Sequence, residues 1–348
     1  MNWKSWLGAT ALLASCAGFA ADALAQNKVV VIMPGGQLVD TMKKAFEPFE
    51  RDRNVKIDWV SAGSATEVVA KVAASKAAPD FDVAFADDAS LSNGSKQGLW
   101  APLDPALVPN VKDLVPAAVP PTKDGVGYAF FFGGMFYRVD EFEKNKWAPP
   151  TSWHDLFKPE FCNRAGFYHP NISYGLHMLI MLGGGDIANI DKGISELAAH
   201  RKCIPVLETS AAKFEEKVQL GDYVIGNIPA IRGIPLARRG VKIRFVVPKE
   251  GVVIAYATAS AIKNDTNPER VKLAQEVVNW LIGPFAQETL MNNMFFNPSN
   301  STVKVPPELV DAGLLSTERM KEMVTLPIDV VVKNRRDWSM RVDRVMSQ

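Results

Sequence analysis

Three predicted β-strands alternate with two helices near the start of the chain, and this order constrains the fold more than any other feature. Residues 28–33 form a continuous run rich in β-branched side chains, as expected for a strand buried on both faces. Residues 55–60 and 81–86 are further strand-like runs, and helical segments separate the three. Because parallel neighbours need crossover helices, this β-α-β-α-β order predicts an α/β fold with a parallel sheet.

Composition narrows the class of protein. A hydrophobic content of 47% against 22% charged residues is too apolar for a disordered chain. The formal net charge of +1 gives no basic face of the kind that nucleic-acid binding uses, so we expect no nucleic-acid partner. The 348 residues favour one large α/β domain or two lobes around a shared cleft.

Residues 1–25 have the pattern of a cleaved signal peptide. Lys4 precedes an apolar run over residues 7–21, and residues 23–25 (Ala-Leu-Ala) supply the small side chains that signal peptidase accepts. The apolar run is shorter than the roughly 20 residues needed to span a bilayer. We therefore expect export as a soluble chain. The alternative is lipidation at Cys16, because the residues before it resemble a lipobox.

Two cysteines, Cys162 and Cys203, remain after cleavage. In an oxidising compartment, an even pair favours a disulfide bond over two buried free thiols. A bond that closes a loop of about 40 residues contributes roughly 3–4 kcal/mol in the chain-entropy model. The pair lacks the CxxC spacing of redox enzymes and zinc sites.

No motif indicates catalysis or metal binding. The sequence lacks HExxH, GxSxG, a P-loop and a GxGxxG after a strand, and its four histidines never have i,i+4 spacing. Residues 210–213 match SxxK, but the SDN and KTG elements of β-lactamase-like enzymes are absent. We interpret Ser210 as a helix N-cap, and we expect no enzyme, no cofactor and no metal.

Three turns between a strand and a helix contain glycine or polar residues, at 35–37, 63–65 and 173–175. Free backbone N–H groups and the helix dipole at such turns favour anions. Ligands of open α/β sheets also bind beyond the carboxyl ends of the strands. Turn chemistry and helix capping explain any one turn alone, but the three together favour a binding cleft.

Short motifs also follow one another in a characteristic order over nearly the whole mature chain. After the first strand and its glycine turn, they lie at residues 46–50, 55–57, 81–83, 98–104, 149–156, 248–251 and 297–298. Each motif is short. The ordered set resembles the periplasmic solute-binding proteins of ABC importers, in the branch that includes the polyamine and iron binders.

The resemblance implies two Rossmann-like α/β lobes with central mixed sheets, joined by two crossing hinge strands, with a ligand cleft between them. By analogy, lobe 1 comprises residues 27–130 and 258–303, and lobe 2 comprises 131–257 and 304–348. Ligand contacts to both lobes favour a closed state. The closed protein then docks on an inner-membrane permease powered by an ATPase. We expect a periplasmic monomer that binds a small molecule and performs no chemistry.

The residues expected at the ligand argue against two ligand classes of this branch. Polyamine binders usually have a Trp and an Asp where this chain has Ala255 and Ala257, and the adjacent tyrosines of ferric-ion binders do not occur. Arg232 favours a carboxylate or phosphonate, with a surface or interlobe ion pair as an equal alternative. We expect a small anionic or zwitterionic solute. The alternatives are a polyamine or other cation and, on the same fold, a periplasmic enzyme.

The predicted site draws on both lobes. Asp87 and Asp88 follow a strand and either hold an amine or cap the next helix. Tyr174 and Tyr256 either contact the ligand or are half-buried aromatic residues of the core. The full predicted set is Gly36, Gln37, Ser64 and Asp87 from the first lobe, with Ser173, Tyr174, Arg232 and Tyr256 from the second lobe or the crossover.

Overall fold

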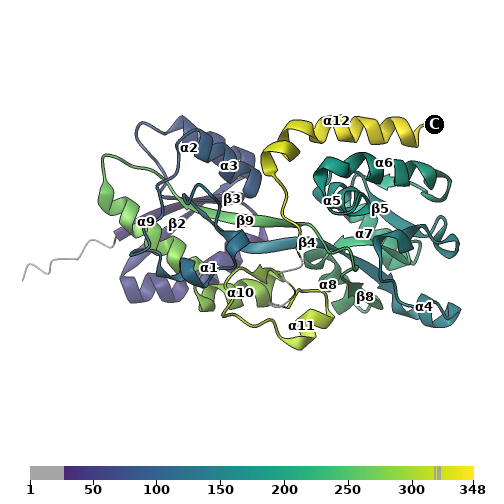
Figure 1. Ribbon diagram of the computed structural model, residues 1–348. Helices are drawn as coiled ribbons and strands as arrows, with labels where there is room; N and C mark the ends of the chain where they lie inside the picture. Colours follow the sequence, from purple (N-terminus) through teal and green to yellow (C-terminus); the bar gives the residue numbers. More distant parts are fainter. Residues whose placement is uncertain (1–26, 317–318, 320–322) are drawn as a thin grey trace, which may run out of the picture.

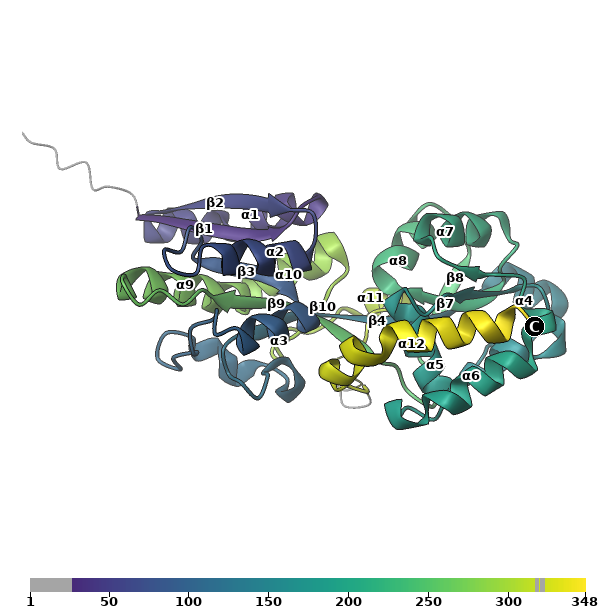
Figure 2. The ribbon, with the colours of Figure 1, turned by 90° about the horizontal axis from the view of Figure 1, so that it is seen from above.

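A computed structural model describes the chain except for residues 1–26, 317–318 and 320–322. The predicted signal peptide and the lipobox cysteine Cys16 lie outside these described residues. Figures 1 and 2 show two α/β lobes side by side, joined by long strands near the middle of the molecule. Among the helices of the described part, none is long and apolar enough to cross a membrane.

Lobe 1 is built on the parallel strands that the sequence predicts. Strand β1 lies between β2 and β3 and is parallel to both. Helix α1 covers one face of this sheet, and α2 and α3 cover the other (Figure 1). The bounds are β1 (Asn27–Pro34), α1 (Gln37–Arg53), β2 (Val55–Ala62), α2 (Ala65–Ala74), β3 (Val83–Asp87) and α3 (Asp88–Lys96).

Two antiparallel strands connect the lobes. Strand β9 (Ile254–Ala261) pairs with β3, and β4 (Val126–Arg138) pairs with β9 as far as Phe132. From Gly133 onwards, β4 pairs instead with strands of lobe 2. The sheet is therefore mixed, and β4 is part of both lobes.

Lobe 2 repeats the α/β arrangement around the second half of β4. Strand β7 lies between β4 and β5, and β6 continues the sheet in parallel. The strands are β5 (Ala165–Tyr168), β6 (Leu207–Glu208), β7 (Ile225–Pro229) and β8 (Ile243–Val246). The helices are α4 (Val139–Asn145), α5 (Ser173–Leu182), α6 (Ile190–Ala199), α7 (Ala211–Leu220) and α8 (Ala230–Arg238).

The last part of the chain, from α9 onwards, covers both lobes. Helices α9 (Pro268–Leu281) and α10 (Pro284–Met294) pack on α1 in lobe 1. Strand β10 (Asn297–Pro298) pairs with β4, and α11 (Pro307–Asp311) follows. The long helix α12 (Ile328–Met346) returns to lobe 2, where it lies along α6 while its first turn contacts α3 of lobe 1 (Figures 1 and 2).

The described elements also include short 3-10 helices, at Pro109–Asp113, Pro116–Ala118, Trp153–Phe157, Pro159–Phe161, Ile187–Asn189 and Arg201–Cys203. The predicted disulfide bond between Cys162 and Cys203 is confirmed. It ties the segment before β5 to the segment before β6. The sequence predicts helices over residues 173–182, 211–220 and 268–281, and α5, α7 and α9 have these bounds. Helices α8 and α10 were not predicted.

Candidate ligand-binding site

Four of the predicted residues lie at the edge of lobe 1 that faces lobe 2, where the parallel strands end (Figure 2). Gly36 is the N-cap of α1, Gln37 is its first residue, Ser64 is the N-cap of α2 and Asp87 is the N-cap of α3. All four are exposed. The structure therefore places them at the edge where open α/β sheets bind ligands.

Two of these four residues, Ser64 and Asp87, already use their side chains to cap a helix. Ser64 Oγ accepts a hydrogen bond from Glu67 N at 3.1 Å, and Asp87 Oδ1 accepts one from Ser90 N at 2.8 Å. Gly36 has φ +94°, and within the described residues no side chain caps α1. The first N–H groups of α1 therefore lack the side-chain acceptor that α2 and α3 have, which suits an anion or a polar solute.

Lobe 2 presents the start of two further helices towards lobe 1. Ser173 and Tyr174 open α5, and Arg232 lies in the first turn of α8. As far as the structure is described, neither helix has a side-chain cap. Arg232 Nη1 donates to Glu215 Oε1 at 2.7 Å, so its ion pair lies within lobe 2 and not between the lobes.

Tyr174, in the first turn of α5, packs against β4. Its carbonyl oxygen accepts a hydrogen bond from Asn227 Nδ2 at 2.9 Å, and its ring lies against the backbone of Gly133. Burial raises the pKa of Tyr174 to about 12, and the positive charge of Arg232 opposes this shift. Tyr174 and Arg232 therefore belong to one cluster in lobe 2.

Arg335 of α12 also lies beside the start of α5, and no sequence motif indicates it. Its guanidinium donates to three neutral oxygens of the turn before α5: Pro170 O at 3.3 Å, Asn171 O at 2.7 Å and Ser173 Oγ at 3.3 Å. Burial lowers the pKa of Arg335, and the charge of Asp87 in lobe 1 opposes this shift. No carboxylate of the described residues lies within 4.0 Å of Arg335.

Buried polar atoms around α5 also lack partners. In the part of the chain that is described, Tyr168 Oη, His177 Nδ1 and Asn227 Oδ1 accept or donate no hydrogen bond. Burial lowers the pKa of His177 to about 3, and the charge of Arg335 adds to this effect. His177 is therefore neutral. Such unsatisfied groups are rare in protein interiors and are satisfied by bound water or by a ligand.

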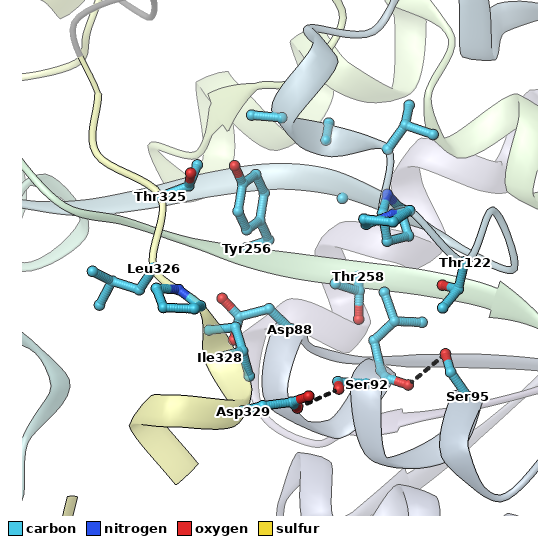
Figure 3. Close-up of a pocket in the computed structure, with 18 residues that line it drawn as sticks. Asp88, Ser92, Ser95, Thr122, Tyr256, Thr258, Thr325, Leu326, Ile328 and Asp329 are labelled. Atoms are coloured by element: carbon cyan, nitrogen blue, oxygen red, sulfur yellow. Dashed lines mark hydrogen bonds between the residues drawn. The ribbon is translucent and has the colours of Figure 1, made fainter. Parts of the chain in front are cut away.

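Tyr256 is separated from the other predicted residues. On β9 it alternates with Ala255 and Ala257, so its ring lies on the opposite face of the sheet from Ala257. It lines a pocket of about 580 Å³ with Asp88 and the start of α12 (Figure 3). None of the other seven predicted residues is among the residues that line this pocket.

Ser210 has the role that its sequence context predicts. It is the N-cap of α7, and its Oγ accepts a hydrogen bond from Lys213 N at 3.4 Å. The SxxK match is therefore a capping motif. In the described residues, no group of three or more His, Cys, Asp or Glu side chains has the arrangement of a metal site.

Two α/β lobes that share a crossing strand and face each other with uncapped helix starts define a ligand-binding protein of the two-lobed class. The chain belongs to the bacterial extracellular solute-binding proteins, a family that it matches over residues 44–317.

Relatives and solved structures agree with this family. The chain is 25% identical to the putrescine-binding periplasmic protein SpuD of Pseudomonas aeruginosa (strain UCBPP-PA14), over 94% of each chain. It is 22% identical to the putrescine-binding periplasmic protein PotF of Escherichia coli (strain K12), over 86% of this chain and 84% of that protein. A putative extracellular solute-binding protein from Bordetella parapertussis has a similar structure, with a TM-score of 0.81 at 20% identity over 92% of this chain and 99% of that chain.

These findings confirm the predicted family and the two-lobed α/β fold. The protein is the solute-binding component of an ABC transporter, and the family consists of binding proteins and not of enzymes. Proteins of this family bind a small ligand and deliver it to an ABC permease.

Proposed function

We propose that this protein captures a small solute with a carboxylate group, an anion or a zwitterion, between its two lobes. The observation that carries the proposal is the guanidinium of Arg335, which is partly buried at the interlobe face without a carboxylate partner among the described residues. A charged group removed from water needs a counter-charge. A carboxylate of the solute would supply it with the bidentate geometry that guanidinium favours.

The helix starts of lobe 2 support the same ligand class. The first turns of α5 and α8 have no side-chain cap in the described structure, and both carry positive dipole ends. Ser173 Oγ already accepts from Arg335, so its hydroxyl hydrogen remains available to a ligand oxygen. Arg232 supplies a second positive charge, although Glu215 neutralises much of it.

Asp87 on lobe 1 fits the amino group of a zwitterion. Its charge acts on Arg335 across the gap between the lobes, so the two groups have the opposite signs that an amino acid would match. A solute bound to both would favour the closed arrangement by contacting both lobes. The predicted contacts of Gly36, Gln37, Ser64, Ser173 and Tyr174 remain part of the proposal, whereas Tyr256 lies on the other face of β9 from Ala257 and is not part of it.

A cationic solute is the second candidate. The putrescine-binding proteins of P. aeruginosa and E. coli favour it, as does the carboxylate of Asp87. Ala255 and Ala257 argue against it, because they offer neither an aromatic wall nor a carboxylate.

The wider role follows from the family. By analogy with the family, we place lobe 1 at residues 27–130 and 258–303 and lobe 2 at 131–257 and 304–348. The change of partners along β4 after Phe132, close to the first of these boundaries, supports this division. In this proposal the chain is exported by its signal peptide and acts in the periplasm as a monomer. Its closed form docks on a permease that an ATPase drives.

A thermal-shift screen tests the ligand class. Three series of matched chain length are compared: diamines, amino acids and dicarboxylates. A ligand at 100 times its Kd adds about 2.7 kcal/mol to the free energy of unfolding, which the melting temperature reports. We expect at least one compound with a carboxylate to raise the melting temperature. If only diamines raise it, or if no carboxylate compound does, the proposal is wrong.

A further inference from the structure

A pocket on the other face of β9 from Ala257 is built from four separate segments. They are α3, residues 117–122, the paired strands β4 and β9, and residues 325–329 at the entry to α12 (Figure 3). The volume of about 580 Å³ is in the range of small-molecule sites. Segments from distant parts of the sequence thus enclose a space large enough for a small metabolite.

The polar groups in this pocket are acidic or neutral. Two carboxylates, Asp88 and Asp329, line it, and no lysine, arginine or histidine is among its described lining residues. Six hydroxyl groups complete the polar lining: Ser92, Ser95, Thr122, Tyr256, Thr258 and Thr325. The charge of the walls therefore favours a cation.

The two carboxylates differ in their partners. Asp329 Oδ1 accepts from Lys96 Nζ at 2.5 Å and from Ser92 Oγ at 3.1 Å, so a lysine neutralises it. Asp88 Oδ1 accepts the backbone N–H of Ala89 at 2.8 Å, and the backbone of Tyr256 also hydrogen-bonds this carboxylate. Within the described chain no basic side chain pairs with Asp88, so its charge is the one in the pocket that no lysine or arginine neutralises.

A second polar group of the pocket, beside Asp88, points to a ligand. The hydroxyl of Tyr256 is buried, lines the pocket and has no hydrogen-bond partner in the described structure. An ammonium group has three donors, enough for a carboxylate, a phenol oxygen and one further acceptor.

The remaining walls are apolar. Leu91, Val119, Pro120, Leu326 and Ile328 line the pocket beside the polar groups. Apolar walls with a few convergent polar groups are the usual composition of a small-molecule site. An aliphatic chain attached to the ammonium group would be accommodated there.

We propose that this pocket is a second ligand site, which binds a small organic ammonium ion through Asp88 and Tyr256. The pocket also joins the two lobes, since α3 belongs to lobe 1 and residues 325–329 belong to lobe 2. It is distinct from the predicted site because it lies on the other face of β9 from Ala257, and Gly36, Gln37, Ser64, Ser173 and Arg232 do not line it. The inference does not rest on the charge of the solute that binds between the lobes.

Isothermal titration of the mature chain with n-butylammonium at pH 8 tests the site, with n-butanol as the neutral probe of matched shape. We expect n-butanol to bind at least about tenfold more weakly than n-butylammonium, because it lacks the charge. The variant Asp88→Asn should weaken amine binding by about tenfold or more. Asp311→Asn, which removes the same charge from exposed α11, should leave binding unchanged.

Two further variants locate the bound amine. Thr122→Trp, on an exposed part of the rim, should fill the pocket and abolish amine binding without altering the core. Asp87→Asn should retain binding, because Asp87 does not line the pocket. If Asp87→Asn abolishes amine binding while Asp88→Asn and Thr122→Trp retain it, the amine binds beside Asp87 and not in this pocket, and the proposal is overturned. Absence of measurable amine binding, or equal affinity for amine and alcohol, would overturn it as well.

Discussion

The guanidinium of Arg335 donates a hydrogen bond to the hydroxyl of Ser173 at 3.3 Å, which ties the C-terminal helix to the first residue of α5. The two residues are 162 positions apart in the sequence. Through this contact α12 contributes a positive charge to the helix start that faces lobe 1. The same helix contacts α3 of lobe 1 through Asp329, so α12 touches both sides of the interlobe region.

The buried carboxylate of Asp88 predicts a pH-dependent stability. Burial raises the pKa of Asp88 to about 6, and the negative charge of Asp87 adds to the shift. Between pH 4 and 6, the unfolded chain has lost this proton while the folded chain keeps it. The contribution of Asp88 to the free energy of unfolding therefore falls as pH rises through this window, by up to about 3 kcal/mol.

The variant Asp88→Asn isolates this effect. We expect it to unfold at higher urea concentration than the wild type above pH 6, with a difference that shrinks towards pH 4. Urea titrations across this range measure it, with Asp311→Asn as the control. The other titratable groups that face Asp88 are unchanged in all three proteins: Asp87 beside it, Lys96 on the same helix, Asp329 on α12 and Tyr256 on β9. Parallel pH profiles of Asp88→Asn and the wild type would contradict the raised pKa.

We expect removal of the disulfide bond to lower the free energy of unfolding substantially. Cys162 and Cys203 close a loop with a sequence separation of 41. The double variant Cys162→Ser, Cys203→Ser should lose roughly 3–4 kcal/mol of unfolding free energy, since the unfolded chain gains entropy. Urea denaturation measures this loss. The reduced wild type should unfold like the double variant, and an unchanged midpoint in both would refute the prediction.

We expect the substitution Gly193→Ala in α6 to lower stability, although helix propensity alone would raise it. Propensity alone favours Gly193→Ala by about 1 kcal/mol. In the structure, a Cβ at this position would overlap the carbonyl oxygen of Leu179 in α5, so α6 would have to move away. We expect a net loss of about 1–3 kcal/mol, as for other overpacked sites.

Thermal unfolding of Gly193→Ala measures this effect. Ser195→Ala on the exposed side of the same helix is the matched control, and it should unfold at or slightly above the wild-type temperature. A Gly193→Ala variant that is more stable than the wild type would show that α5 and α6 do not pack as closely as described.

Helices with local start and stop signals could be predicted from the sequence. Helix α7 begins after the Ser210 cap and ends at Gly221 in the left-handed conformation, and α9 begins with the Asn267 cap and Pro268. Helix α8 was missed because Pro235 lies inside it and no polar residue caps its start. A proline inside a helix usually breaks it, so the local signals argued against the observed structure.

The candidate site was less predictable. The turns after β1, β2 and β3 could be identified, since residues at the ends of parallel strands meet at one edge. Arg335 could not, because its position beside Ser173 depends on how α12 packs on lobe 2, and no nearby motif indicates it. The separation of Tyr256 from the other residues follows from strand alternation once the pairing with β4 is known.

The affinity of the Arg335→Gln variant tests the central claim most directly. The ligand is the carboxylate compound with the largest thermal shift, and isothermal titration compares the variant with the wild type. Arg336→Gln, at the exposed neighbouring position, is the matched control because it removes the same charge. We predict that Arg335→Gln weakens binding by about tenfold or more while Arg336→Gln binds like the wild type. Equal affinity in all three proteins would contradict a solute carboxylate held by Arg335.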